Sequence, residues 1–299
     1  MRVNPNFASD LIADLQQSQA ALNTATQQVA TGKSVNLPSD NPYAAAAMVQ
    51  NTIETSDDDQ YTQNVTSVLS TLQSADSALS SVVTSLTSAI SLGTEGANGT
   101  SNSSNQKALA EQVQGLLASV VQQANTSVGG VYLFGGSSTS TPYTADSSSS
   151  TGYTYNGNDD VNSVEIGDGV SVPVGLPGSQ IFSSSSNNVI GSLSSLVTAL
   201  QSGSSTAIGS AVSAVSSALS YVGQQQVVLD NSETQVSSQQ TTLQQDTVTL
   251  ASQENNLIGV NEATAAIDLT QAETDNSAAL AAAAKVLPTS LLNYLSPPS

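Results

Sequence analysis

Three short segments carry residue types that bind phosphate or metal ions in other proteins. Gly32-Lys33-Ser34 has the last three residues of a phosphate-binding loop. That motif needs a glycine five residues before its Gly-Lys pair, and Gln27 occupies this position. The segment also follows a predicted helix, whereas a phosphate loop follows a strand. We therefore interpret Gly32 as the end of a helix and the next residues as a loop.

The acidic segments give no better case for a metal site. Asp57-Asp58-Asp59 falls in a predicted helix, where successive side chains point in different directions and cannot converge on one ion. Asp159-Asp160 and Asp168 fall in predicted turns, and their spacing matches no calcium-binding loop. We expect no metal ion and no other cofactor.

The composition also excludes several catalytic mechanisms. The 299 residues include no His and no Cys, so a Ser-His-Asp triad, a histidine or cysteine zinc site and a disulfide are impossible. A Ser-Lys or carboxylate pair could still be formed, but no spacing singles one out. We expect no catalytic residues and no enzymatic activity, and a hydrolase is a remote alternative.

The charge balance limits the possible partners. The chain has 23 acidic residues, four basic residues and a formal net charge of -19. Nucleic acids and anionic membrane surfaces both need clustered Lys and Arg, so neither is expected as a partner. Only 9% of the residues are charged, and a surface of uncharged polar residues suits contact with other proteins. The N-terminus has no apolar core of signal-peptide length, and the most apolar stretch, Ala278 to Leu287, is too short to span a membrane. We therefore expect any secretion to use no conventional cleaved signal.

Hydrophobic spacing predicts long helices. One helix is expected from the Ser9-Asp10 cap to Gly32, and a second from the Asn41-Pro42 cap towards Gly93. The second contains an apolar seam with alternating steps of four and three, typical of a coiled coil. Its members are Tyr61, Val65, Val68, Leu72, Ala75, Leu79, Val82, Leu86 and Ala89.

The rest of the chain alternates between helical and β patterns. After a loop at 93–105, a helix is expected up to Gly129-Gly130. A small antiparallel sheet with turns at Asn156-Gly157 and Gly167–Gly169 follows. A further helix begins near Val189. The helix with the longest repeat is expected next, at 207–258, with apolar residues every seven positions: Val215, Val222, Leu229, Val236, Leu243, Leu250 and Leu257.

These helices define the fold class. At about 1.5 Å per residue, the helix over 207–258 would be near 75 Å long, which predicts a rod and not a compact domain. A last helix is expected from Glu262 to a stop at Pro288, followed by the apolar tail Leu291–Leu295. The fold is therefore expected to be mainly α, an elongated bundle of long helices formed by both halves of the chain with a small inserted antiparallel β domain.

Two segments and the C-terminal helix resemble one family. The first segment runs from Thr31 to Pro42, and the second from Ala124 to Gly136. Both resemble the bacterial flagellin superfamily, and within it the branch of hook–filament junction proteins. The matching residues are Gly32, Pro38, Ser39, Asp40, Asn41, Pro42, Asn125, Thr126, Tyr132, Leu133, Phe134, Gly135 and Gly136. In one departure from the family motif, Asn41 stands where Asp is common, and Asn caps a helix equally well.

The resemblance implies a structural role in the flagellum. The neighbours would be copies of the same chain in a ring, hook-associated protein 1, flagellin and, before export, a flagellar chaperone. Residues 1–42 with 260–299 would form an assembly domain, 43–135 with 189–259 a helical rod, and 136–188 an outward-facing β domain. Periodicity and family position together predict these interface residues: Leu11, Leu15, Leu22, Val29, Ile267, Leu280, Leu287 and Leu291.

Two rival functions remain open. Flagellin itself belongs to the same class, although the Ser-Asp-Asn-Pro and Leu-Phe-Gly-Gly segments argue against it. A secreted coiled-coil effector or adhesin belongs to a different class, and it would not need family-like segments at both ends of the chain.

Overall fold

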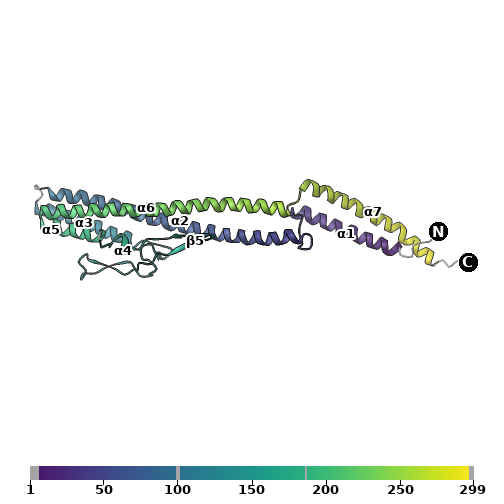
Figure 1. Cartoon of the computed structure of the whole chain (residues 1–299), viewed down its shortest axis with the longest axis horizontal. Coiled ribbons are helices and arrows are strands. Elements are labelled where there is room, and N and C mark those ends of the chain that lie inside the picture. Colours follow the sequence, from purple (N-terminus) through teal and green to yellow (C-terminus); the bar gives the residue numbers. More distant parts are fainter. Residues whose placement is uncertain (1–6, 99–101, 186, 296–299) are drawn as a thin grey trace. The chain divides into compact units, whose positions relative to one another are not determined.

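The computed structural model describes residues 7–98, 102–185 and 187–295, and over these it is mainly helical with short strands (Figure 1). The elements in chain order are α1 (Phe7–Thr31), α2 (Pro42–Ala97), α3 (Ser103–Ala124), β1 (Ser127–Val128), β2 (Val131–Tyr132), β3 (Tyr143–Ala145), β4 (Tyr153–Tyr155), β5 (Ser163–Gly167), β6 (Val170–Pro173), α4 (Gly178–Ile181), α5 (Val189–Ser202), α6 (Ser205–Ile258) and α7 (Glu262–Leu295).

The chain folds into two compact units. Met1–Asp57 and Asp246–Ser299 form one, called here the terminal unit, and Asp58–Gln245 forms the other, the central unit. The boundary falls inside α2 and α6, so each of these helices contributes residues to both units. The predicted fold class, long helices from both halves of the chain with a small antiparallel insert, is confirmed.

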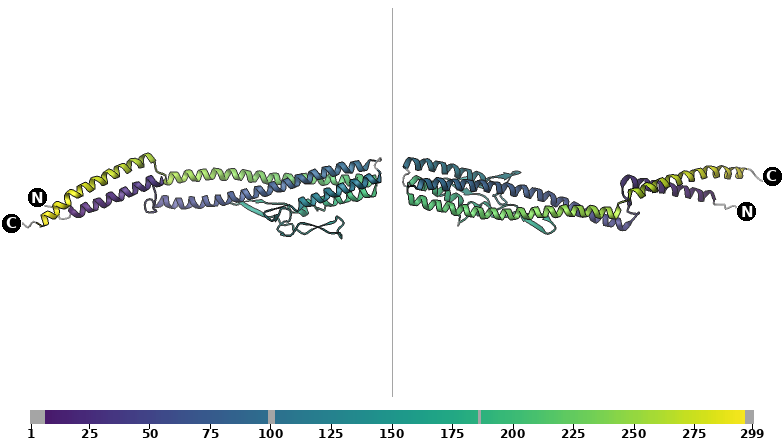
Figure 2. Two further views of the ribbon diagram at one scale, coloured as in Figure 1. Left: turned by 180° about the vertical axis from the view of Figure 1, so that it is seen from behind. Right: turned by 90° about the horizontal axis from the view of Figure 1, so that it is seen from above.

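In the central unit, the core is built on the predicted seams of α2 and α6. The two helices lie side by side in all three views (Figures 1 and 2). All the seam residues of α2 from Val65 to Ala89 are buried, and so are Val215, Val222, Leu229, Val236 and Leu243 of α6. Helices α3 and α5 pack against each other and add Leu109, Val113, Leu193 and Leu196 to the same hydrophobic cluster.

The insert consists of three separate two-stranded antiparallel pairs, β1–β2, β3–β4 and β5–β6. The turn predicted at Gly167–Gly169 is correct. The turn at Asn156-Gly157 is wrong, because Tyr153–Tyr155 pairs with the preceding Tyr143–Ala145. Gly129-Gly130 does not end a helix, since α3 already ends at Ala124. Both glycines have positive φ, +60° and +85°, and form the turn between β1 and β2.

Two helix boundaries also differ from the prediction. Gly93 was expected in a loop, but α2 continues through it to Ala97. A side chain at Gly93 would collide with Val212 and Leu196, so this glycine allows close packing of helices. Proline normally interrupts a helix, yet α7 continues through Pro288 to Leu295.

Polar residues interrupt the apolar seam of α6. Gln226 Nε2 donates a hydrogen bond to Asp76 Oδ1 of α2 at 3.1 Å. One heptad further along α6, the Glu233 Oε1 atom is buried and accepts no hydrogen bond from any described residue. Burial raises the pKa of Glu233, and the nearby carboxylates of Asp76 and Asp230 raise it further. The seam therefore contains one carboxylate that destabilises it when ionised.

Gly93 offers a test of the close packing between α2 and its neighbours. An added Cβ would lie 2.5 Å from Val212 Cγ2, so Gly93→Ala should lower the free energy of unfolding by about 1–3 kcal/mol. Gly223 of α6 has open space around it, and Gly223→Ala should raise the same quantity by about 0.5–1 kcal/mol. Urea denaturation measures both, and equal effects of the two substitutions would contradict the packing argument.

Glu233 offers a test of the seam electrostatics. Because its pKa is higher in the folded than in the unfolded chain, stability should fall as the pH rises through the interval between the two values. Glu233→Gln should therefore raise the Tm at pH 7 and have little effect near pH 3, where the carboxyl is neutral in both states. Thermal melts at both pH values are the measurement, with the exposed Glu111→Gln as the control. A lower Tm of Glu233→Gln at pH 7 would show that the carboxylate stabilises the seam.

Candidate assembly interface

In the terminal unit, α1 and α7 pack along each other (Figure 1). The predicted stripe of α1 supplies its contact face: Leu11, Leu15 and Leu22 are half-buried, and Ala25 is buried. Two helices alone leave much of each circumference uncovered, which explains why none of these leucines reaches full burial.

The matching stripe of α7 was missed in the sequence because most of its residues are alanines. Its members are buried or half-buried at alternating steps of four and three: Ala265, Leu269, Ala272, Asn276, Ala279 and Ala283. Alanine is common throughout this helix, so composition hides the heptad pattern that burial reveals. The Ser18 Oγ and Asn276 Nδ2 atoms are buried in this unit without a hydrogen-bond partner among the described residues.

Six of the eight predicted interface residues have described side chains, and these six divide into two groups. Leu11, Leu15 and Leu22 face α7 at least in part. Val29, Ile267 and Leu280 are exposed, Ile267 by 67%. The side chains of Leu287 and Leu291 lie outside the described residues.

Large apolar side chains are exposed mainly on the terminal unit. Of thirteen such side chains among the described residues, only Val131, Val161, Val227 and Val228 belong to the central unit. The other nine are Ile12, Val29, Leu37, Tyr43, Val49, Ile53, Val248, Ile267 and Leu280. By contrast, the only buried apolar side chains described in this unit that are larger than alanine are Leu250 and Ile258. The terminal unit thus exposes more large apolar side chains than it buries, a property typical of protein interfaces.

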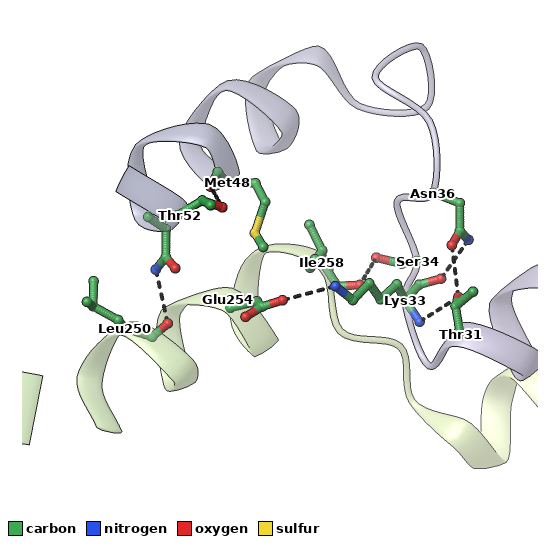
Figure 3. Close-up of polar contacts among 10 residues, drawn as sticks. Thr31, Lys33, Ser34, Asn36, Met48, Thr52, Leu250, Glu254 and Ile258 are labelled. Atoms are coloured by element: carbon green, nitrogen blue, oxygen red, sulfur yellow. Dashed lines mark hydrogen bonds and ion pairs between the residues drawn. The ribbon is translucent and has the colours of Figure 1, made fainter. Parts of the chain in front are cut away.

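Backbone hydrogen bonds join the segment that follows α1 to the segment between α6 and α7. Lys33, after α1, and Gly259, after α6, form an isolated antiparallel bridge. The Ser34 N–H donates to the Ile258 carbonyl at 2.6 Å, and the Val260 N–H donates to the Gly32 carbonyl at 3.1 Å. Figure 3 shows Ser34 next to Ile258, and the Lys33 side chain extended towards Glu254 of α6, whose Oε1 atom it reaches at 3.0 Å. We call this set of contacts the clasp.

The backbone conformation of the first family segment, Thr31 to Pro42, explains most of its characteristic residue types. Gly32 ends α1 with a φ of +68°, as the prediction of a helix end requires. The Asp40 carboxylate accepts hydrogen bonds from the N–H groups of Asn36 and Leu37 and closes the loop. The Asn41 side chain accepts from the Ala44 N–H and caps α2, with Pro42 as the first helical residue. The segment therefore shapes the connection that carries the clasp.

The second family segment attaches the β insert to the helices. The Asn125 side chain donates to the Tyr143 carbonyl and accepts from the Tyr143 N–H, both at 2.8 Å. Phe134 is fully buried and packs edge-to-face on Phe182 with ring centroids 5.2 Å apart. Gly136 has a φ of +68° and lies against Asn158, which leaves no room for a side chain.

Neither a metal-binding cluster nor a membrane-spanning helix is found among the described residues. They contain no group of three or more His, Cys, Asp or Glu side chains arranged to hold a metal ion. None of the described helices is both long and apolar enough to cross a membrane. Hydrogen bonds from Ser148 and Thr154 lower the pKa of Asp146 to about 2, and burial raises the pKa of Tyr143. Both groups have local structural partners, so their shifts need no functional explanation.

Gly259 gives a direct test of the clasp. A Cβ there would collide with the Asn255 side chain and backbone, so Gly259→Ala should open the bridge. Hydrogen–deuterium exchange at the Ser34 and Val260 amides should then accelerate by about tenfold or more. Lys33→Met removes an ion pair whose side chains are 45% and 36% exposed, and such a pair contributes less than about 1 kcal/mol. If Lys33→Met accelerates exchange as much as Gly259→Ala does, the ion pair and not the backbone holds the clasp.

Comparison with known proteins agrees with the resemblance seen in the sequence. Residues 4–139 match the family model for the bacterial flagellin N-terminal helical region. No curated protein matches this sequence. Among solved structures, a protein from Vibrio parahaemolyticus described as flagellar hook-associated aligns with a TM-score of 0.67 and 19% identity, over 74% of this chain and 100% of that chain.

Two structures from Legionella pneumophila are similar to a comparable degree. The flagellar hook associated protein-3 aligns with a TM-score of 0.64 and 14% identity, over 70% of this chain and 98% of that chain. The flagellar junction protein FlgL aligns with a TM-score of 0.61 and 14% identity, over 71% and 100%. The predicted resemblance to the flagellin superfamily and to its junction proteins is confirmed, in sequence over the N-terminal part and in fold over about 70% of the chain.

Proposed function

We propose that this protein is a structural subunit of the bacterial flagellum, placed at the hook–filament junction. It would join hook-associated protein 1 to flagellin as a ring of identical subunits. The observation that carries the proposal is the excess of exposed large apolar side chains on the terminal unit, together with the fold of flagellar hook-associated and junction proteins.

The mechanism would be burial that is completed on assembly. In the monomer, α1 and α7 cover only one side of each other, and Val29, Ile267 and Leu280 face solvent. Complete burial of a fully exposed Val, Leu or Ile side chain gains about 1.5–3 kcal/mol, and these partly exposed side chains would gain a fraction of it. Neighbouring subunits can provide that burial, so association would stabilise helices that bury few large apolar side chains by themselves.

Further parts of the proposal follow from the family. Residues 1–42 with 260–299 act as the assembly domain, 43–135 with 189–259 as its helical support, and 136–188 as a domain that faces outwards. The protein acts outside the cell, reaches the flagellum through its export apparatus without a cleaved signal peptide, and is held by a flagellar chaperone beforehand. It works by packing and not by catalysis.

Two other functions make different predictions. A flagellin would be present in far more copies than a junction subunit. A secreted coiled-coil effector or adhesin would be dispensable for swimming.

Loss of the gene tests the proposed function. Electron microscopy of the deletion strain should show intact hooks without filaments, and flagellin should appear in the medium. A plasmid copy should restore filaments, whereas a copy without Leu291–Ser299 should not. Normal filaments in the deletion strain would disprove the junction role.

Point substitutions test the assembly surface itself. Ile267→Asp and Leu280→Asp change exposed residues, so each should alter the free energy of unfolding by less than about 0.5 kcal/mol. A carboxylate at an interface is costly to bury, so both should strongly reduce swimming in soft agar. The control is Val131→Asp, at a position of the central unit whose exposure, 61%, lies between those of Leu280 and Ile267. Full motility of both terminal-unit variants would remove these positions from the interface.

A further inference from the structure

Each helix of the α1–α7 pair has one polar residue within its apolar seam. Between Leu11 and Ala25, the buried or half-buried residues of α1 are all Leu or Ala except Ser18. Along the stripe of α7 they are all Leu or Ala except Asn276, which is only 9% exposed. The Ser18 Oγ and Asn276 Nδ2 atoms are buried without a hydrogen-bond partner among the described residues. An amide can donate to a hydroxyl, yet these two groups do not pair.

The two polar residues lie about one turn apart along the helix pair. The helices α1 and α7 are antiparallel (Figure 1), and a groove beside their seam is lined by residues of both, from 14–21 and from 268–275. Because these two spans are equal in length and run in opposite directions, Ser18 lies level with Ala272. Asn276 lies roughly one helical turn beyond that level.

A shift of one turn would bring the two polar residues together. Such a shift replaces each residue of the α7 stripe by the next member of the same stripe, so Ser18 would meet Asn276 in place of Ala272. Leu22 would meet Ala272 in place of Leu269, and a large residue facing a small one favours close packing. The other residues that would enter new contacts in the seam are all Leu or Ala, so the shifted seam stays apolar.

The clasp opposes this shift. The connection from α1 to α2 covers residues 32–41, whereas the connection from α6 to α7 covers only 259–261. The helix with slack for a movement is therefore α1, and a slide of about 5 Å towards its own N-terminus would pull Ser34 away from Ile258. A buried unpaired polar atom costs as much free energy as a backbone hydrogen bond contributes, or more. The two unpaired atoms are therefore comparable in free energy with the two backbone hydrogen bonds of the clasp.

We propose that α1 and α7 have two registers one turn apart, and that the clasp selects one of them and the Ser18–Asn276 pair the other. With the clasp closed, the two polar atoms are buried and unpaired, as observed. With the clasp open, α1 slides by one turn and Ser18 pairs with Asn276. Movement of one element by a turn past its neighbour is a known form of conformational change. Both registers belong to the isolated chain, so they do not depend on the flagellar role.

Two pairs of spin labels measure the register. The chain has no cysteine, so Gln27→Cys with Ala278→Cys, and separately Ala13→Cys with Thr264→Cys, place the labels at exposed positions. A slide of α1 shortens the first distance and lengthens the second, each by about 5 Å. Fraying of the helix ends would not change the two distances in opposite directions. Double electron–electron resonance on the full-length monomer measures both distances.

Opening the clasp should change the register. Gly259→Ala, whose added Cβ would collide with Asn255, should shorten the first distance and lengthen the second. Adding Ser18→Ala with Asn276→Ala should return both distances to their starting values, because the second register then loses its hydrogen bond while the seam stays apolar. The control is Asn23→Ala with Ser277→Ala, the same two exchanges at exposed positions, and it should leave the shift in place. Circular dichroism verifies that each variant is helical.

Three results would overturn the proposal. Unchanged distances in Gly259→Ala would show that the clasp does not select the register. A change of both distances in the same direction would indicate fraying and not a slide. Persistence of the shift without Ser18 and Asn276, or its loss in the exposed control, would show that this polar pair does not hold the second register. None of these results bears on the junction role, which is decided by the filaments of the deletion strain.

Discussion

A pair of helices that packs only on itself can bury just one side of each member, and this constraint governs the terminal unit. The seam between α1 and α7 is made of partly covered leucines on one helix and mostly of alanines on the other. Such a seam buries little apolar area, and hydrophobic stabilisation scales with that area. The larger apolar residues of the unit, such as Ile267 and Leu280, lie outside the seam and face solvent. The unit is therefore suited to being completed by other molecules.

In the central unit, other elements of the same unit cover the apolar faces of the long helices. Its two long helices are covered along part of their length by α3 and α5, and elsewhere by the β5–β6 hairpin, whose Ile166 and Val172 are fully buried in the common cluster. Asn64 of α2 donates to the Glu165 carbonyl of this hairpin at 2.7 Å. Because the core is complete, few large apolar side chains remain exposed. The two units therefore differ in how many of their large apolar side chains they bury within the described chain.

Much of this could be predicted from the sequence, because heptad spacing and helix caps are local signals. The seams of α2 and α6, the Asn41-Pro42 cap and the end of α1 at Gly32 all follow from residues close together in the chain. Two of the failures involve residues that are distant in the chain or pair with an earlier strand. At Gly93, α2 continues and packs closely against Val212 and Leu196 of other helices. The strand Tyr153–Tyr155 pairs with the strand that precedes it in the sequence and not with the one that follows it.

The candidate interface shows the same limit. Periodicity identified Leu11, Leu15 and Leu22, but it could not distinguish the seam of α7 from its exposed side, because alanine occurs on both. The clasp joins residues more than 200 positions apart through backbone groups, and no side-chain pattern indicates such a contact. Likewise, only the structure shows that the Ile267 side chain is exposed.

The central claim is that the apolar surface of the terminal unit becomes buried in the assembled flagellum. The natural chain has no cysteine, so a single Ile267→Cys substitution gives a unique thiol whose reaction with a maleimide can be followed. The account predicts rapid labelling in the purified monomer and strong protection in isolated hook–filament complexes, with Val131→Cys labelled in both. Equal labelling of Ile267→Cys in the monomer and in the assembled complex would contradict the account.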